Sequence, residues 1–444
     1  MSHRRLWLAE VGMPEPRWYQ MCGRAAQVTG VLARHALATV PAVARNAPRG
    51  STVVRAVLRD RLRALVCGLG ASYIKGAQLL STRQDLLPAA VCETLGQLHD
   101  RVPAMSTEQA RTAVSSAFAG RDWPFVEFDW TPIASGSIAC VYRATLHDGR
   151  EVAVKVRRPG IGPRMYADFA MLAAGARLMH RLPGMRRLPA SEMVGQISEA
   201  VLRQLDFETE ADSLRMLGGN LSDLDFLRVP TPVDEVRADG ILVMEFIPGL
   251  RRVTGGELPA ETAALAVRRV LHCVYRMLFL DGVVHCDLHP GNLYLDLQGE
   301  VVLLDAGFVV HLKPRVRRLF AEFFFNMSRG NGRQCADIIV RSTDNGGAGA
   351  DLERFRTEII ELVSATHKKS AGEFQLAPFA AKLFDLQRRC GLYAAPEFVF
   401  PLLSLLVIEG MINEFDAGVD FQAEAKPVLI KSLLTAVPRE PAAS

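Results

Sequence analysis

The chain has 444 residues and is 49% apolar, so it can bury a large core and form two or three domains or lobes. A formal net charge of +4 is small for this length, which argues against a nucleic-acid partner. The eight cysteines are scattered without CxxC or CxxxH pairs, which argues against a zinc site or a disulfide framework and fits a reducing cytoplasm.

The N-terminal part is expected to be helical. It carries no secretory signal pattern, because Glu10 interrupts the first apolar stretch. Residues 24–63 mix valine, leucine and alanine with many arginines, and two interpretations stay open. The segment could rest on an anionic membrane leaflet, or it could be a helix packed on its own domain. Pro48 and Gly50 predict a break in the helix at residues 47–50.

A candidate phosphate-binding segment begins at residue 132 and leads through a hairpin into the strand of residues 151–156. The small residues at its first turn are Ala134, Ser135, Gly136 and Ser137. Small side chains let backbone amides approach phosphate oxygens, and Lys155 on the following strand could bridge the α and β phosphates. Only eight of the 52 basic residues are lysine, so a lysine here departs from the chain's own usage. A solvated strand lysine is the alternative.

Such a lysine needs an acidic partner from a helix. Apolar residues recur with helical spacing through residues 191–217, which predicts a helix over this range. We assign Glu210 as the partner, and Glu208 is the rival on a different face. The ion pair would position the amine and add little stability, because a partly buried pair roughly offsets its own desolvation.

The most informative stretch is His285-Cys286-Asp287-Leu288-His289-Pro290-Gly291-Asn292, followed by Asp305. In a kinase-type site, an aspartate at position 287 would face the attacking oxygen, while Asn292 and Asp305 would bind Mg²⁺. Residues 293–295 and 301–304 predict a hairpin that returns Asp305 beside Asn292. The alternative is that these side chains only cap turns and end a strand. We expect both histidines to order the loop by hydrogen bonds, and Cys286 to be a small buried filler.

The rest of the chain is expected to be mostly helical. Only residues 306–314 separate Asp305 from the next helical run at 315–323, and no Ala-Pro-Glu segment follows, so phosphorylation of a protein in trans is disfavoured. The longest apolar run, residues 398–408, is interrupted by Pro401 and is too short to cross a bilayer as a helix. We expect this run and residues 323–325 to be core.

Residues 73–416 resemble the UbiB/AarF family of atypical protein-kinase-like proteins, a group linked to isoprenoid quinone biosynthesis. The most specific mark is residues 72–88, which are similar to the family's KxGQ segment and its SxRxDLLP continuation. The loop 132–141 is similar to the family's Ala-rich loop. Two further marks are the Leu-Asp-Phe and Glu-Ala pattern of residues 205–211 and the loop 285–292.

Four positions depart from the family pattern. Ala77 stands where the KxGQ glycine is expected, Gln204 replaces the first carboxylate of the ExD motif, Gly136 replaces an alanine, and Ala306 replaces the phenylalanine of the usual DFG. Loss of the carboxylate at 204 could remove a contact to Lys75 or to a metal. Glycine at 136 would make the phosphate loop more flexible.

The resemblance implies an α+β, two-lobed protein-kinase-like fold with an N-terminal helical extension. Its expected parts are the extension at 1–115, an N-lobe at 116–248 and a mostly helical C-lobe at 249–444. The extension would lie across the peptide-docking side of the site and bring Lys75 and Gln78 to it. Backbone groups at Glu245 and Ile247, near a hinge, would meet adenine.

The resulting expectation is a Mg²⁺-dependent ATPase or kinase that binds ATP and supports isoprenoid quinone or lipid metabolism. Its partners would be the nucleotide and a lipid or quinone precursor, and its location cytoplasmic or peripheral at a membrane. Two other classes stay open. Residues 285–293 are also similar to the loop of aminoglycoside-type phosphotransferases, although those enzymes lack a segment like 73–88. A noncatalytic scaffold would bind nucleotide without releasing phosphate.

Overall fold

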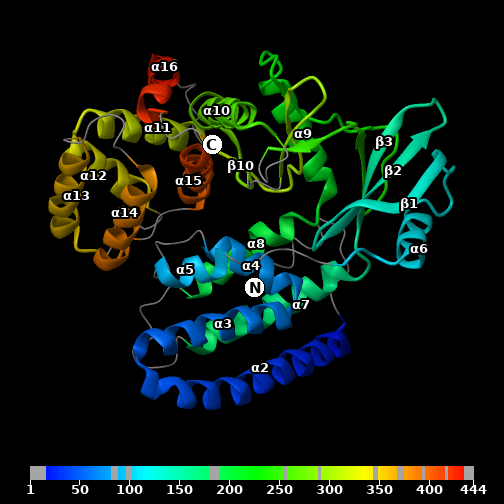
Figure 1. The fold of residues 1–444 in the computed structure, drawn as a ribbon, viewed down its shortest axis with the longest axis horizontal. Helices are drawn as coiled ribbons and strands as arrows, with labels where there is room; N and C mark the ends of the chain where they lie inside the picture. The colour runs from blue at the N-terminus through cyan, green and yellow to red at the C-terminus, as the bar shows by residue number, and fades with distance from the viewer. Residues whose placement is uncertain are drawn as a thin grey trace, which may run out of the picture. The chain divides into compact units, whose positions relative to one another are not determined.

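The computed structural model describes residues 17–81, 89–96, 103–179, 190–253, 258–288, 292–343, 349–367, 375–392, 396–415 and 419–434. The chain divides into two compact units. Unit 1 takes residues 1–82, 89–211 and 232–246, and unit 2 takes residues 83–88, 212–231 and 247–444. Figure 1 shows the helices and strands of both units and labels many of them with the names used below.

The N-terminal helices of unit 1 pack with two later helices, α7 and α8, in a helical layer. Its members are α2 (Trp18–Asn46), α3 (Ser51–Leu69), α4 (Ala71–Ser81), α5 (Ala89–Gly96), α7 (Ile161–Met179) and α8 (Ala190–Arg203). The predicted break is confirmed: a short 3₁₀ turn, Ala47–Arg49, follows α2, and Gly50 adopts φ +99° before α3 begins. Glycine reaches this conformation without steric cost, which lets the chain reverse and pack α3 against α2.

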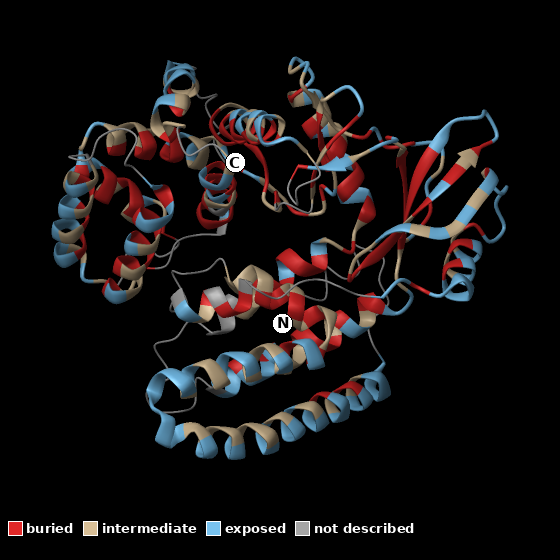
Figure 2. Cartoon of the chain, in the orientation of Figure 1, coloured by how far each residue is buried: buried red, intermediate tan, exposed pale blue. Residues whose placement is uncertain are grey.

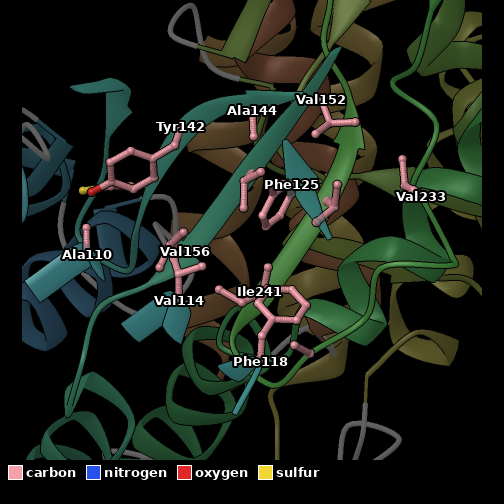
Figure 3. Close-up of a cluster of buried hydrophobic side chains, with 14 of the residues drawn as sticks. Ala110, Val114, Phe118, Phe125, Tyr142, Ala144, Val152, Val156, Val233 and Ile241 are labelled. Atoms are coloured by element: carbon pink, nitrogen blue, oxygen red, sulfur yellow. The ribbon is translucent and has the colours of Figure 1, made fainter. Parts of the chain in front are cut away.

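The sheet of unit 1 has the antiparallel order β1 (Phe125–Ser135), β2 (Ala139–Leu146), β3 (Glu151–Arg157), β5 (Ile241–Glu245). Helix α6 (Thr107–Ala117) covers this sheet. One hydrophobic core joins Ala110 and Val114 of α6, and Phe118 just after it, to Phe125 and Tyr142 of the sheet (Figure 3). Helix α6 packs on β1 and β3 of this sheet.

The single helix predicted over residues 191–217 is wrong. The structure has α8 up to Arg203 and a separate helix, α9 (Phe207–Asn220). Asp206 causes the restart, because its Oδ1 accepts hydrogen bonds from the backbone N–H groups of Glu208 and Thr209 at 3.1 and 3.2 Å. An aspartate in this position satisfies the otherwise unpaired amides of a first helical turn.

Unit 2 contains short strands and most of the C-terminal helices. One sheet has the order β4 (Leu227–Arg228), β9 (Val301–Leu303), β8 (Leu293–Leu295), β6 (Arg251–Arg252), and a second pairs β10 (Val309–His311) with β7 (Val283–His285). The helices are α10 (Ala260–Arg276), α11 (Pro314–Ser328), α12 (Gly332–Arg341), α13 (Leu352–His367), α14 (Leu376–Cys390), α15 (Pro396–Phe415) and α16 (Phe421–Leu434). The π-helical turn η2 (Met277–Asp281) follows α10 directly.

Helix α15 corrects a second prediction. Pro401 does not interrupt the apolar run, because the helix continues through it to Phe415. Among the described residues this is the one helix long and apolar enough to cross a membrane, yet 65% of its apolar window is buried inside the protein. Phe398 stacks on Phe320 with ring centroids 4.1 Å apart. Figure 2 shows the buried character of α15, and Phe398, Val399, Phe400, Leu402, Leu405 and Ile408 are core, as predicted for this run.

Candidate active site

Lys155 lies on β3 in the middle of the unit 1 sheet, opposite Val141 of β2 and Leu242 of β5. Its Nζ donates to the carboxylate oxygens of Glu210 at 2.6 and 2.9 Å. Both side chains are buried, at 11% and 1% exposure. A charged pair removed from water in this way is held in one geometry, and loss of either partner leaves an uncompensated charge.

Glu210 reaches the lysine because of the new start of α9. It lies in the first turn of that helix, on the side that faces β3. Glu208 is exposed instead, with its carboxylate 3.5 Å from Arg237. The ring of Phe207 lies 5.4 Å from the ammonium of Lys155 and closes another side of the amine. The structure therefore joins Lys155 to the acid that we assigned and not to its rival.

The small-residue segment forms the connection between β1 and β2. Ala134 and Ser135 end β1, while Gly136 and Ser137 lie in the turn, which the Gly136 amide closes on the Ala139 carbonyl at 2.9 Å. Glycine is not required at 136 for space, since the nearest atom to an added Cβ would be the Ala139 carbonyl oxygen at 3.7 Å. The alanine usual in the similar family would fit here.

Arg158 holds this turn, although no motif in the sequence pointed to it. Its Nε donates to the Gly136 carbonyl and its Nη2 to the Ser135 hydroxyl, each at 2.9 Å. Its backbone amide donates to the Ile138 carbonyl at 2.8 Å. The guanidinium thus fixes the turn from the end of β3, a contact that follows from sheet pairing and not from any motif.

In unit 2, the predicted hairpin is confirmed by the antiparallel pairing of β8 with β9, in which Leu293 lies opposite Leu303. Asn292 immediately precedes β8, and its Nδ2 donates to the Asp287 carbonyl at 2.9 Å. Because the nitrogen is used by the loop, the amide oxygen of Asn292 is the atom suited to bind a metal. The Leu304 amide approaches the Asn292 carbonyl at 3.5 Å, which brings the start of Asp305 next to Asn292.

Asp305 has an unusual backbone. With φ +58°, it is the one non-glycine residue among the described parts of the chain with a positive φ. This left-handed conformation is unfavourable for most side chains and is often found at functional positions. The Asp305 side chain is exposed, whereas Ala306 beside it is buried at 2% exposure, so the residue that replaces phenylalanine in this chain is part of the core.

His285 orders the beginning of the loop, as predicted. It is fully buried, its Nδ1 accepts from the Asp287 amide at 3.2 Å, and its carbonyl accepts from the Ser404 hydroxyl at 3.1 Å. Burial lowers the pKa of this histidine, so the ring stays neutral. Burial also raises the pKa of Cys286 to about 12, which keeps that thiol protonated and supports its reading as a filler. His289 lies outside the described residues.

The remaining predicted residues lie on defined elements. Glu245 ends β5 and Ile247 follows in unit 2, where it is buried. Lys75 and Gln78 are three residues apart on α4 and therefore share one helix face. Helix α4 is itself anchored, because the Ser72 hydroxyl donates to Asp168 of α7 at 2.6 Å. The continuation of this segment at 82–88 lies outside the described residues.

The donor set fits magnesium. Asn292 and Asp305 offer an amide and a carboxylate oxygen, the hard ligands that Mg²⁺ takes when phosphates and water complete its shell. No group of three or more His, Cys, Asp or Glu side chains that could hold a metal occurs among the residues described.

Residues 97–339 match the model of the ABC1 atypical kinase-like domain, more than half of the chain. The chain belongs to the ABC1 atypical kinase-like family. Its curated relatives include three proteins named "Probable protein kinase UbiB", from Aeromonas hydrophila subsp. hydrophila, Erwinia tasmaniensis and Cronobacter sakazakii. Each is 31% identical to this chain, and the matches cover 83–84% of this chain and 69–70% of the relatives. The predicted UbiB resemblance is therefore confirmed.

A solved structure shares the fold of this ABC1 family member. The complex of Rv3197 with erythromycin from Mycobacterium tuberculosis matches with a TM-score of 0.57 and 18% identity, over 83% of this chain and 95% of the other. Together with the family match, this likeness confirms the α+β, kinase-like fold with N-terminal helices.

Proposed function

We propose that this protein binds Mg·ATP and acts as an ATPase or a kinase of a small lipid-like substrate in isoprenoid quinone metabolism. The observation that carries the proposal is the buried ion pair in which Glu210 holds the Lys155 amine at 2.6 and 2.9 Å. A buried lysine fixed by a helix glutamate is the arrangement that kinase-like proteins use to position the α and β phosphates.

The other assigned residues take complementary roles in this proposal. The backbone of Ala134 to Ser137, braced by Arg158, would contact the phosphates, and the backbone near Glu245 and Ile247 would meet adenine. Asn292 and Asp305 would hold Mg²⁺, which neutralises charge on the phosphate oxygens when bound. Asp287 would accept the proton of the attacking hydroxyl or water. Lys75 and Gln78 would approach the same site from the extension.

The quinone pathway is proposed from the relatives' names and the family resemblance. A lipid or isoprenoid precursor is favoured as the substrate over a protein. Residues 306–313 between Asp305 and α11 leave no room for a long activation loop, and β10 occupies part of this short connection. Docking of a peptide substrate normally depends on such a loop.

Measurement of phosphate release tests the catalytic part of this proposal. We expect Mg²⁺-dependent ATP hydrolysis by the wild type, with and without vesicles that carry quinone precursors, and a loss of at least about a hundredfold in Asp287→Asn. The matched control is Asp122→Asn, which makes the same aspartate-to-asparagine change at an exposed position and should retain full activity.

Thermal shift separates binding from catalysis in the same preparations. Asp287→Asn should still be stabilised by Mg·ATP, because Asp287 acts on the attacking group and not on the nucleotide. If ATP raises the melting temperature of the wild type while no phosphate is released under any condition, the protein is a nucleotide-binding scaffold. Transfer of phosphate to a soluble small-molecule hydroxyl would support the aminoglycoside-type alternative.

A further inference from the structure

The outer face of α2 carries a continuous stripe without any charged residue. Its members recur at helical spacing, and each is exposed: Trp18, Cys22, Ala26, Thr29, Ala33, Leu37, Val40 and Ala44. Trp18, Leu37 and Val40 expose 77%, 77% and 70% of their surface. The opposite side of the same helix packs on α3 and α7 through residues such as Arg24 and Val28. The stripe is therefore the solvent side of a packed helix (Figure 2).

Apolar exposure is concentrated in this region. Of the eighteen large apolar residues that are exposed among the described parts of the chain, seven lie on α2 and α3. A surface helix of a globular domain normally presents polar side chains to water, and a helix that is apolar on both sides is expected to be covered on both. The face of α2 thus calls for a second partner besides its own domain.

The charge around the stripe identifies the chemistry of that partner. Between residues 17 and 81 the sequence has ten basic residues and a single acidic one, Asp60, although the whole chain has a net charge of only +4. The exposed arginines just before α2, on α2, on the turn after it and on α3 are Arg17, Arg34, Arg45, Arg49, Arg55 and Arg59. A long apolar stripe flanked by arginines matches a surface that is apolar inside and anionic outside.

A second copy of the chain fits this face poorly. Two copies meeting through α2 would bring the same excess of arginines together, with Asp60 as the one acidic residue of the segment available to offset it. Like charges placed face to face disfavour association. An anionic lipid layer has the opposite sign, and its acyl region can receive tryptophan, leucine and valine side chains.

We propose that α2 and the basic residues around it form a membrane-docking surface that lies flat on an anionic lipid bilayer. Helix α2 has 29 residues and is about 43 Å long, so the stripe can enter the headgroup region along its whole length. The protein would be peripheral through this face, and neither α2 nor α3 would cross the bilayer. This inference does not depend on the proposed catalysis, because it concerns binding alone.

Flotation of the full chain with vesicles tests the docking surface. Wild-type protein should float with vesicles of equal parts phosphatidylcholine and phosphatidylglycerol and stay behind with phosphatidylcholine alone. The double variant Leu37→Gln, Val40→Gln removes apolar contact without adding charge. Each of its two substitutions should weaken vesicle binding by roughly tenfold or more. Arg34→Gln and Arg45→Gln should each weaken binding by roughly fivefold, and raised salt should have the same direction of effect.

Leu265→Gln is the matched control. Leu265 is 50% exposed on α10, so its substitution also removes an exposed leucine but should leave flotation unchanged. Melting temperatures of all variants should match the wild type, because each substituted side chain is exposed. The proposal is overturned if the wild type ignores anionic vesicles, or if the Leu265 control loses as much binding as the stripe variants. It is also overturned if the wild type is a dimer that does not bind vesicles and the stripe variants are monomers.

Discussion

Arg24 and Asp168 are 144 positions apart in the chain and form a buried, two-point ion pair. Nε and Nη2 of Arg24 donate to the two carboxylate oxygens at 2.7 and 3.0 Å, and Asp168 has no exposed surface. The same guanidinium donates to the Leu69 carbonyl at 2.6 Å, and the Ser72 hydroxyl binds Asp168. One pair thus ties α2, the end of α3 and α4 to α7.

This network predicts a large cost for removal of one partner. Arg24→Met leaves a carboxylate buried without its counter-ion, so the free energy of unfolding should fall by about 3–5 kcal/mol. Urea denaturation measures the change. Arg203→Met, which removes an exposed ion pair with Glu199, should change the same quantity by less than about 1 kcal/mol. Equal effects of the two substitutions on the free energy of unfolding would show that the buried network stabilises the protein no more than an exposed ion pair does.

Substitutions in the pair of Lys155 and Glu210 should affect ATP binding and the free energy of unfolding separately. Lys155→Met should abolish ATP binding and lower the free energy of unfolding, because the carboxylate of Glu210 then stays buried without the ammonium of Lys155. The double variant Lys155→Met, Glu210→Gln should recover part of the stability while ATP binding stays lost. Glu208→Gln is the control and should retain both. Isothermal titration with Mg·ATP and urea denaturation supply the two readouts. Full ATP binding by Lys155→Met would contradict the assigned role.

Substitution of Asp305 should reduce ATP binding, and one of the two substitutions should also stabilise the fold. Asp305→Asn should abolish metal-dependent ATP binding, because a carboxylate ligand is lost while the backbone keeps its shape. Asp305→Gly should lose the same binding but raise the free energy of unfolding by up to about 1 kcal/mol, since glycine adopts φ +58° without strain. Titration of ATP at several Mg²⁺ concentrations checks the first statement. Unchanged Mg·ATP binding in Asp305→Asn would count against the metal role.

His285 predicts a pH dependence of stability. Burial lowers its pKa in the folded protein, so below the unfolded pKa of about 6.5 the unfolded chain takes up a proton that the folded chain does not. The contribution of His285 is therefore complete above pH 6.5 and is lost as the pH falls toward the folded pKa. His285→Gln should be less stable at neutral pH yet show a smaller fall over this window. Urea denaturation at several pH values compares the two, and parallel curves would refute the assignment.

The sequence determined those features that depend on neighbouring residues. The hairpin around residues 296–300 and the break at Gly50 follow from turn residues and the patterns beside them, and both are present. The order of functional groups along the chain also identified Asp287, Asn292 and Asp305 as one set. Their roles in binding Mg·ATP stay predictions.

Only the tertiary structure decided contacts between residues distant in sequence. Periodicity could not show that Asp206 restarts a helix, because α8 and α9 have compatible apolar spacing on both sides of it. Pro401 lies inside α15, where packing on α10 and α14 outweighs the hydrogen bond lost at the proline. Arg158 on the phosphate turn and Arg24 on Asp168 depend on which strands and helices meet. Local sequence encodes local conformation, whereas such pairings arise only from the way the whole chain packs.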